Sequence, residues 1–152
     1  MSLIKNGTLK KKNGLKMSNY NLFLDDKFLP EQIANLPKTN EKDRIRYRTY
    51  IWKIANTYEE FVNIVKEHGI PGIVSFDHDL AEEHWDFIYT DENWFKQDDA
   101  IMIDYDIFKI KTGYHAAEWL IEHCSFIGKE MPICLVHSQN EVGRKNIENL
   151  LF

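Results

Sequence analysis

The sequence predicts an α/β domain in which a short parallel sheet of about four strands is flanked by helices on both faces. Three observations lead to this prediction. Short apolar runs alternate with segments of helical spacing, capping residues stand before several of those segments, and polar residues follow three of the predicted strands. Because ligands bind at the carboxyl ends of the strands in such sheets, we expect one site assembled from three loops.

The first part of the domain contains two predicted strands. Residues 20–24, "YNLFL", form the first strand, which ends at Asp25 and Asp26. Residues 47–55, "YRTYIWKIA", are rich in β-branched and aromatic residues, which predicts the second strand. Between them, residues 27–46 contain two prolines, and no helix with defined bounds is predicted there.

A capping box predicts the next helix. Thr57 is followed three positions later by Glu60, apolar residues then recur at helical spacing, and Gly69 ends them. The third strand, residues 72–76, follows and leads into the polar residues 77–79, "DHD".

Residues 82–111 interrupt this alternation, with nine acidic residues, three lysines and seven aromatic residues. Aromatic side chains in that number are not expected to stay in solvent. We therefore predict an insertion that contains a small hairpin or lid. An alternative role for it is the docking of a protein partner.

The predicted alternation resumes after the insertion. Thr112 is the expected N-cap of a helix with an apolar inner face. Pro132 precedes the fourth strand, residues 133–137, "ICLVH". A last helix is predicted over residues 141–152, with Asn140 as its expected N-cap.

Composition narrows the class of protein. The length of 152 residues suits one domain, predicted over residues 19–152, whereas residues 1–18 are expected to be a disordered extension, an upstream start or a remnant of cloning. A net charge of −5 argues against general DNA binding. Both cysteines are expected to be reduced, and no apolar run is long enough to span a membrane, which together favour a cytoplasmic protein.

Four carboxylates follow the first and third predicted strands: Asp25, Asp26, Asp77 and Asp79. Without a cation, clustered carboxylates raise one another's pKa values, so a divalent metal is the simplest partner. Mg²⁺ is the expected ion, because it needs one or two carboxylates together with water and substrate oxygens. A neighbouring imidazole ligand would favour Mn²⁺, Zn²⁺ or Fe²⁺ instead.

Two histidines stand among these acids, His78 after the third strand and His137 at the end of the fourth. The pKa of an imidazole lies near neutrality, so we expect the pair to act as general base and general acid on a phosphodiester or cyclic phosphate. Asp77 belongs to the same predicted catalytic group. A structural role for His78, as a buried and satisfied histidine, is the alternative.

Phosphate-binding residues are expected around the start of the last helix, whose N-terminus attracts anions. The candidates are Ser138, Asn140 and Arg144. Helix capping by Asn140, and by Asp79 in its own loop, is the structural alternative.

Four segments together resemble the family of cyclic-phosphate processing receiver domains: "LFLDD", "VSFDHDL", "KTGYHAAEWL" and "VHSQNEVGRKNI". The resemblance covers roughly residues 19–151 outside the insertion. It implies a three-layer, receiver-like (flavodoxin-like) fold. In receivers an acidic pair follows the first strand, a phosphoacceptor aspartate the third and a hydroxyl residue the fourth, and those positions hold Asp25, Asp26, Asp77 and Ser138.

The sequence also departs from ordinary receivers. A fifth strand and its lysine have no expected counterpart, and a phosphorelay site does not need His78, Asp79 or His137. The family implies a phosphoesterase that acts on cyclic phosphates of nucleotides or RNA ends, with the two histidines as the added catalytic groups. Two alternatives remain: a degenerate receiver that acts as a phospho-switch or nucleotide-binding module without turnover, and an interaction domain.

Overall fold

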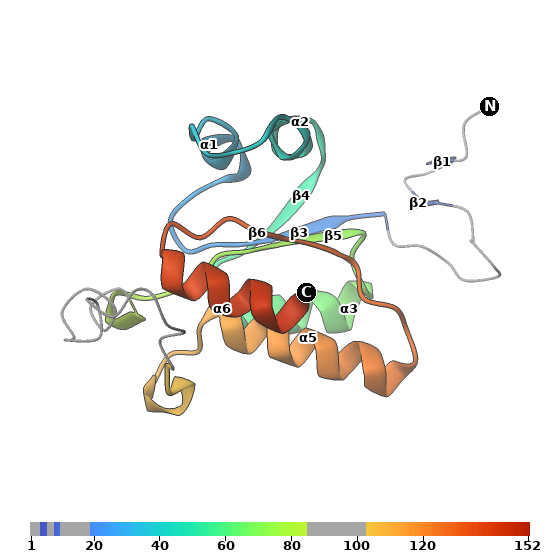
Figure 1. Ribbon diagram of the computed structural model, residues 1–152. Helices are drawn as coiled ribbons and strands as arrows, with labels where there is room; N and C mark the ends of the chain where they lie inside the picture. The colour runs from blue at the N-terminus through green and yellow to red at the C-terminus, as the bar shows by residue number, and fades with distance from the viewer. Residues whose placement is uncertain (1–3, 6–7, 10–18, 85–102) are drawn as a thin grey trace.

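The computed structural model describes residues 4–5, 8–9, 19–84 and 103–152, and Figure 1 shows its arrangement. A four-stranded parallel sheet has the strand order β4-β3-β5-β6. Its strands are β3 (Asn21–Leu24), β4 (Trp52–Ala55), β5 (Ile73–Phe76) and β6 (Ile133–Val136). A separate antiparallel pair is formed by β1 (Ile4–Lys5) and β2 (Thr8–Leu9). The predicted parallel α/β sheet is therefore confirmed.

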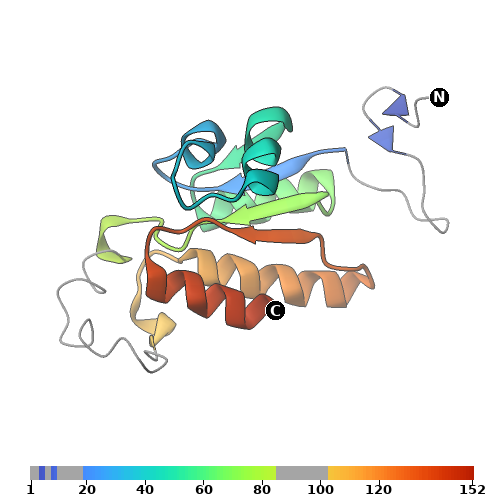
Figure 2. The same cartoon turned by 45° about the horizontal axis from the view of Figure 1, so that its top comes forward.

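Helices cover both faces of the sheet and complete three layers (Figures 1 and 2). One layer contains α1 (Pro30–Ala34) and α2 (Glu41–Thr49). The opposite layer contains α3 (Tyr58–His68), α5 (Gly113–Ile127) and α6 (Glu141–Leu151), with α5 and α6 packed side by side. This is the predicted receiver-like, flavodoxin-like architecture.

Alternating strand residues supply two separate cores. Leu22 and Leu24 of β3 pack in the larger cluster, with residues of α3, α5 and α6. Phe23, which points to the other face, packs in the smaller cluster with residues of α1 and α2. All four residues of β5 are buried, as expected for a central strand of a parallel sheet.

Local signals fix the helices that the sequence predicted. The Thr57 hydroxyl accepts a hydrogen bond from the Glu60 N–H at the start of α3, and Thr112 caps α5 in the same way. The α5 helix ends at Gly128, whose φ of 68° is the left-handed conformation that glycine adopts without strain. Asn140 caps α6 by accepting a bond from the Gly143 N–H, at 3.0 Å.

The prediction of a strand over residues 47–55 is wrong in its first half. Residues 47–49 end the α2 helix, and the strand begins at Trp52. Asn40 caps α2 by accepting a bond from the Asp43 N–H, and two ion pairs between residues three apart support the helix. These local contacts outweigh the β-propensity of the aromatic residues. The helices α1 and α2, for which no bounds were predicted, occupy most of the stretch 27–49.

The predicted insertion, residues 82–111, is described at its two ends. Its later part contains a short 3₁₀ helix, η2 (Tyr105–Ile107). The predicted hairpin or lid falls largely on residues 85–102, outside the described residues. Within the part of the chain that the structure describes, no helix is long and apolar enough to cross a membrane.

Candidate functional site

A pocket of about 190 Å³ opens at the carboxyl ends of the strands. These ends lie on the left of Figure 1, where α6 begins. The lining is rich in carboxylates and comes from the three loops that the sequence predicted. It consists of Asp25, Asp26, Lys27, Phe28, Asp77, Asp79, Ala81, His137, Gln139 and Asn140.

Backbone hydrogen bonds continue the sheet one residue beyond the strands and align three of these side chains. The Asp77 N–H donates to Leu24 O at 2.9 Å, and the His137 N–H donates to Phe76 O at 2.9 Å. Asp25, the residue after β3, is thereby brought level with Asp77 and His137. One ligand atom from each of the three lies within 4.8 Å of the others, an arrangement that fits a metal ion.

Asp25 is held rigidly and is 1% exposed. Its Oδ1 accepts hydrogen bonds from the N–H groups of Lys27 and Phe28, at 2.8 and 3.0 Å. Its Oδ2 lies 2.9 Å from Nε2 of His137. The loop after β3 therefore fixes one carboxylate oxygen and presents the other to the imidazole.

His137 is buried and oriented from behind by two hydroxyl groups. Its Nδ1 lies 2.6 Å from Ser75 Oγ, and Ser75 Oγ lies 2.7 Å from the hydroxyl of Tyr47. The imidazole stacks on the ring of Phe23, with 4.4 Å between the ring centroids. Burial lowers the pKa of His137 and the hydrogen bond to Asp25 opposes that shift, so the neutral imidazole that a metal needs is favoured.

Asp77 is the most perturbed carboxyl group of the pocket. Burial raises its pKa well above the ordinary value, and the negative charges of Asp25 and Asp79 raise it further. Hydrogen bonds from the His78 N–H and from the Ser138 hydroxyl act in the opposite direction. A bound cation would remove the cost of ionising this carboxyl group.

Asp26 lies at the same pocket and is half-buried. Burial raises its pKa, and the charge of Asp25 adds to the shift. Asp26 and Asp77 are therefore the two carboxyl groups of the pocket whose pKa values are raised above the ordinary carboxyl value, and raised pKa values of this kind are common at functional sites.

Asp79 and Asn140 are joined across the pocket. The Nδ2 of Asn140 donates to both carboxylate oxygens of Asp79, at 3.1 and 3.2 Å. The Ser138 hydroxyl accepts a bond from the Asn140 N–H at 3.1 Å. Asn140 thus caps α6 with its oxygen and holds an acidic residue of the pocket with its nitrogen.

His78 lies behind the pocket and does not line it. Its side chain is 0% exposed, its Nδ1 lies 2.7 Å from Asp79 Oδ1, and its Nε2 lies 2.9 Å from the hydroxyl of Tyr105. The same hydroxyl accepts a bond from Asn146 of α6. His78 therefore links the loop after β5 to η2 and to α6.

Two glycines allow this close packing of helix ends on the loop. The Gly113 N–H donates to His78 O at 2.8 Å, and a Cβ at Gly113 would lie 1.6 Å from Asp77 O. A Cβ at Gly143 would lie 2.3 Å from Cγ of the His78 ring. Any side chain at either position would push α5 or α6 away from the residues that carry the site.

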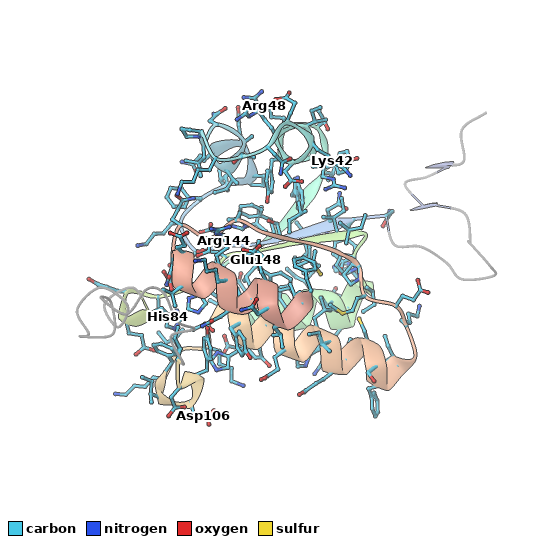
Figure 3. All side chains as sticks on the ribbon, in the orientation of Figure 1. Lys42, Arg48, His84, Asp106, Arg144 and Glu148 are labelled. Carbon is cyan, nitrogen blue, oxygen red and sulfur yellow. The ribbon has the colours of Figure 1, made fainter. Side chains whose placement is uncertain are left out.

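Arg144 lies outside the pocket of about 190 Å³, which we call the acidic pocket. Figure 3 shows Arg144 and Glu148 on the side of α6 that faces β6 and the α1–α2 layer. The guanidinium group lies 3.2 Å from Glu148 and 3.6 Å from Glu141. Arg144 and Ser138 both line a neighbouring groove. The structure thus separates Arg144 from the acidic residues with which the sequence grouped it, whereas the Ser138 hydroxyl still donates a hydrogen bond to Asp77.

Three residues that contribute to the site are not predicted from the sequence: Lys27, Ser75 and Tyr47. Lys27 follows the acidic pair directly and lines the pocket, so its position could have indicated a role. Ser75 and Tyr47 orient His137 from within the core. No sequence signal distinguishes these two from other residues of a strand and a helix, because their contact joins segments far apart in the chain.

The fold and the pocket together define a class: an α/β domain of receiver-like topology with carboxylates collected at the carboxyl edge of its sheet. The chain matches the family described as the cyclic-phosphate processing receiver domain over residues 20–152, and it belongs to that family. No curated protein and no solved structure matches it.

Proposed function

We propose that the protein is a metal-assisted phosphoesterase that hydrolyses cyclic phosphates of nucleotides or RNA ends. One observation carries the proposal: ligand atoms of Asp25, Asp77 and His137 lie within 4.8 Å of one another in a pocket of a cyclic-phosphate processing family. Charged residues also cluster in purely structural ion-pair networks, where the cations lower the pKa values of the carboxyl groups. In this pocket the pKa values of Asp77 and Asp26 are raised instead.

The donor set supports a divalent ion. Two carboxylates and one imidazole, the latter oriented by Ser75, suit Mn²⁺, Zn²⁺ or Fe²⁺ as well as Mg²⁺. Our proposal therefore keeps Mg²⁺, which the sequence favoured, together with Mn²⁺, and Mn²⁺ is the probe ion in the binding experiments below. A cation in this place would polarise the phosphoryl oxygens and lower the pKa of a bound water.

The residues of the chain supply the remaining roles. Asp26, whose pKa is raised, exchanges the proton between the attacking water and the leaving oxygen. Lys27 holds a phosphoryl oxygen by its charge. His78 positions Asp79 through its 2.7 Å contact, in place of the direct acid–base role that the sequence suggested. Water adds to phosphorus, one ester P–O bond breaks, and a phosphomonoester remains.

The test is incubation of the pure protein with 2′,3′-cyclic nucleotides and with RNA bearing a cyclic-phosphate end, in Mn²⁺, Mg²⁺ and Zn²⁺. We expect a phosphomonoester product with at least one metal, and its loss in Asp77→Asn. Asp106→Asn, an exposed acid on η2 in Figure 3, is the matched control and should keep full activity. Survival of both substrates with every metal would end the proposal.

A phospho-switch is the second candidate, supported by Asp77 at the acceptor position with Asp25 and the Ser138 hydroxyl close to it. A phospho-switch would differ from an enzyme in the amount of phosphate that reacts. A small phosphodonor would label the protein once per chain, and Asp77→Asn would abolish the label.

Two further parts of the proposal concern the cellular compartment of the protein and a protein partner. Cys124 and Cys134 are both free, which supports a reducing compartment such as the cytoplasm. Docking of a protein partner through residues 82–111 remains a proposal that a pull-down with that segment replaced would test.

A further inference from the structure

A second hollow, of about 390 Å³, runs along the outer edge of β6. The α1–α2 loop and α2 form one wall, and α6 forms the other. We call this hollow the β6 groove. His137 and Gln139 line both the groove and the acidic pocket, so the two are continuous.

The floor of the β6 groove carries backbone groups that point outwards. The Ile133 N–H donates to Gly72 O at 3.2 Å and the His137 N–H to Phe76 O, so these residues face β5. Peptide groups alternate in direction along a strand, and those of Cys134 and Val136 therefore point to the opposite edge. Among the described residues, no strand pairs with that edge.

This floor suits a planar ligand with adjacent donor and acceptor atoms. Cys134 and Val136 each present an N–H and a C=O, which is the pattern that the Watson–Crick edge of a nucleobase complements. Ile33 and Leu36 add apolar surface to one wall of the groove. Its volume lies within the range of small-molecule sites, which begins at about 300 Å³.

The charge of the groove favours one nucleoside over a longer nucleic acid. Its charged lining residues are Lys38, Arg144, Asp43, Glu141 and Glu148. Acidic residues outnumber basic ones, and Arg144 is paired with two of them. Binding along an RNA backbone needs unpaired positive charge for each phosphate. Of the lysine and the arginine that line the groove, only Lys38 forms no ion pair with a described residue.

We propose that the β6 groove binds the nucleoside part of the substrate, so that the protein acts on 2′,3′-cyclic mononucleotides. The nucleobase lies on the Cys134–Val136 edge, and the cyclic phosphate reaches the acidic pocket past His137. This proposal rests on the proposed function for the phosphate half of the ligand. The nucleoside half can be tested without metal or turnover.

The first experiment follows the backbone amide NMR signals of the metal-free protein during titration with adenosine, which has no phosphate. We expect the signals of Cys134 and Val136 to shift. When Mg²⁺ is then supplied, 2′,3′-cyclic AMP should shift them together with signals of the acidic pocket. Ribose 2,3-cyclic phosphate, which has no base, should bind about tenfold more weakly than 2′,3′-cyclic AMP, the loss expected for two hydrogen bonds.

A variant supplies the second test. Val136→Pro removes one outward N–H, a change that an edge strand tolerates, and should weaken adenosine binding several-fold while Mn²⁺ binding persists. Phe126→Ala, at a residue that is 90% exposed near the end of α5, is the control and should change neither. If Val136→Pro does not fold, the titration of the unchanged protein decides the question.

Three outcomes would overturn the proposal: no shift of the β6 signals with any nucleoside, tighter binding of an RNA oligonucleotide than of the mononucleotide, or shifts that depend on protein concentration alone. The last would show that a second copy pairs with the β6 edge. If adenosine binds at β6 but no cyclic phosphate is hydrolysed, the phosphoesterase proposal fails and the nucleoside site stands.

Discussion

Two buried histidines each pair with an aspartate at the carboxyl edge of the sheet in the described part of the chain, and the two pairs face different surroundings. His137 lies 2.9 Å from Asp25 and borders the acidic pocket, whereas His78 lies 2.7 Å from Asp79 with its ring enclosed by η2 and α6. The same residue types at equivalent strand ends therefore support different roles. A histidine that borders the pocket can bind a ligand, and one that is enclosed positions its neighbours.

The largest expected effect on cation binding comes from His137→Ala. Substitution of a residue that hydrogen-bonds to a metal ligand costs about 10–100-fold in affinity, and loss of a ligand itself should cost at least the upper value. Calorimetric titration with Mn²⁺ measures the change. His68→Ala, at an exposed histidine, is the control, and an unchanged Mn²⁺ affinity in His137→Ala would contradict the assignment of this ligand.

His78→Ala should act on stability instead. It leaves a cavity and removes a partner from both Asp79 and the hydroxyl of Tyr105, which together should cost about 2–4 kcal/mol of unfolding free energy. Urea denaturation measures this loss. A variant as stable as the parent would show that the ring is not enclosed as described.

Gly143→Ala tests the same enclosure from the side of α6. The added methyl group meets the His78 ring, and overpacking of this kind costs about 1–3 kcal/mol. The double variant with His78→Ala should lose less unfolding free energy than the sum of the two single losses, because the smaller side chain at position 78 leaves room for the added methyl group. Strict additivity in urea denaturation would contradict the contact.

Ser75→Ala should weaken Mn²⁺ binding by about tenfold, since the hydroxyl orients His137 and sets which ring nitrogen carries the proton. Rescue by Ser75→Thr, which keeps the hydroxyl, would separate orientation from simple packing. If Ser75→Ala binds Mn²⁺ as tightly as the parent, the serine has no part in positioning the imidazole.

The smallest effect concerns pH and the metal-free protein. Because the folded-state pKa of Asp77 is raised, its protonated form is favoured on folding, so the cost of ionising it appears as pH rises above the unfolded value of about 4. Asp77→Asn removes that cost and should be more stable than the parent by about 1 kcal/mol at neutral pH, with the difference vanishing in acid. If the difference in unfolding free energy between Asp77→Asn and the parent does not depend on pH, the cost of ionising Asp77 is not the cause of that difference.

Much of the fold could be predicted from the sequence, because its signals are local. Thr57 and Thr112 cap helices as expected, and the strand ends bring Asp25, Asp77 and His137 together. The α2 helix was missed because aromatic residues suggested a strand, while the Asn40 cap was overlooked. Local signals of this kind outweigh propensity where the two conflict.

The sequence could not predict which histidine borders the pocket, for a different reason. Whether His78 or His137 borders the pocket depends on contacts with Tyr105 and Ser75, which lie 27 and 62 residues away from them in the chain. The direction of the Arg144 side chain also depends on its contacts, because its ion pairs on α6 hold it over the β6 groove. Residue types and spacing indicate which residues meet but not which way each side chain faces.

The cation site is tested most directly by a crystal structure of the protein soaked in Mn²⁺, with the ion located by its anomalous scattering. We predict one strong peak in contact with Asp25, Asp77 and His137, and none beside His78. A peak held by other residues, or no peak in the acidic pocket at saturating Mn²⁺, would contradict this prediction.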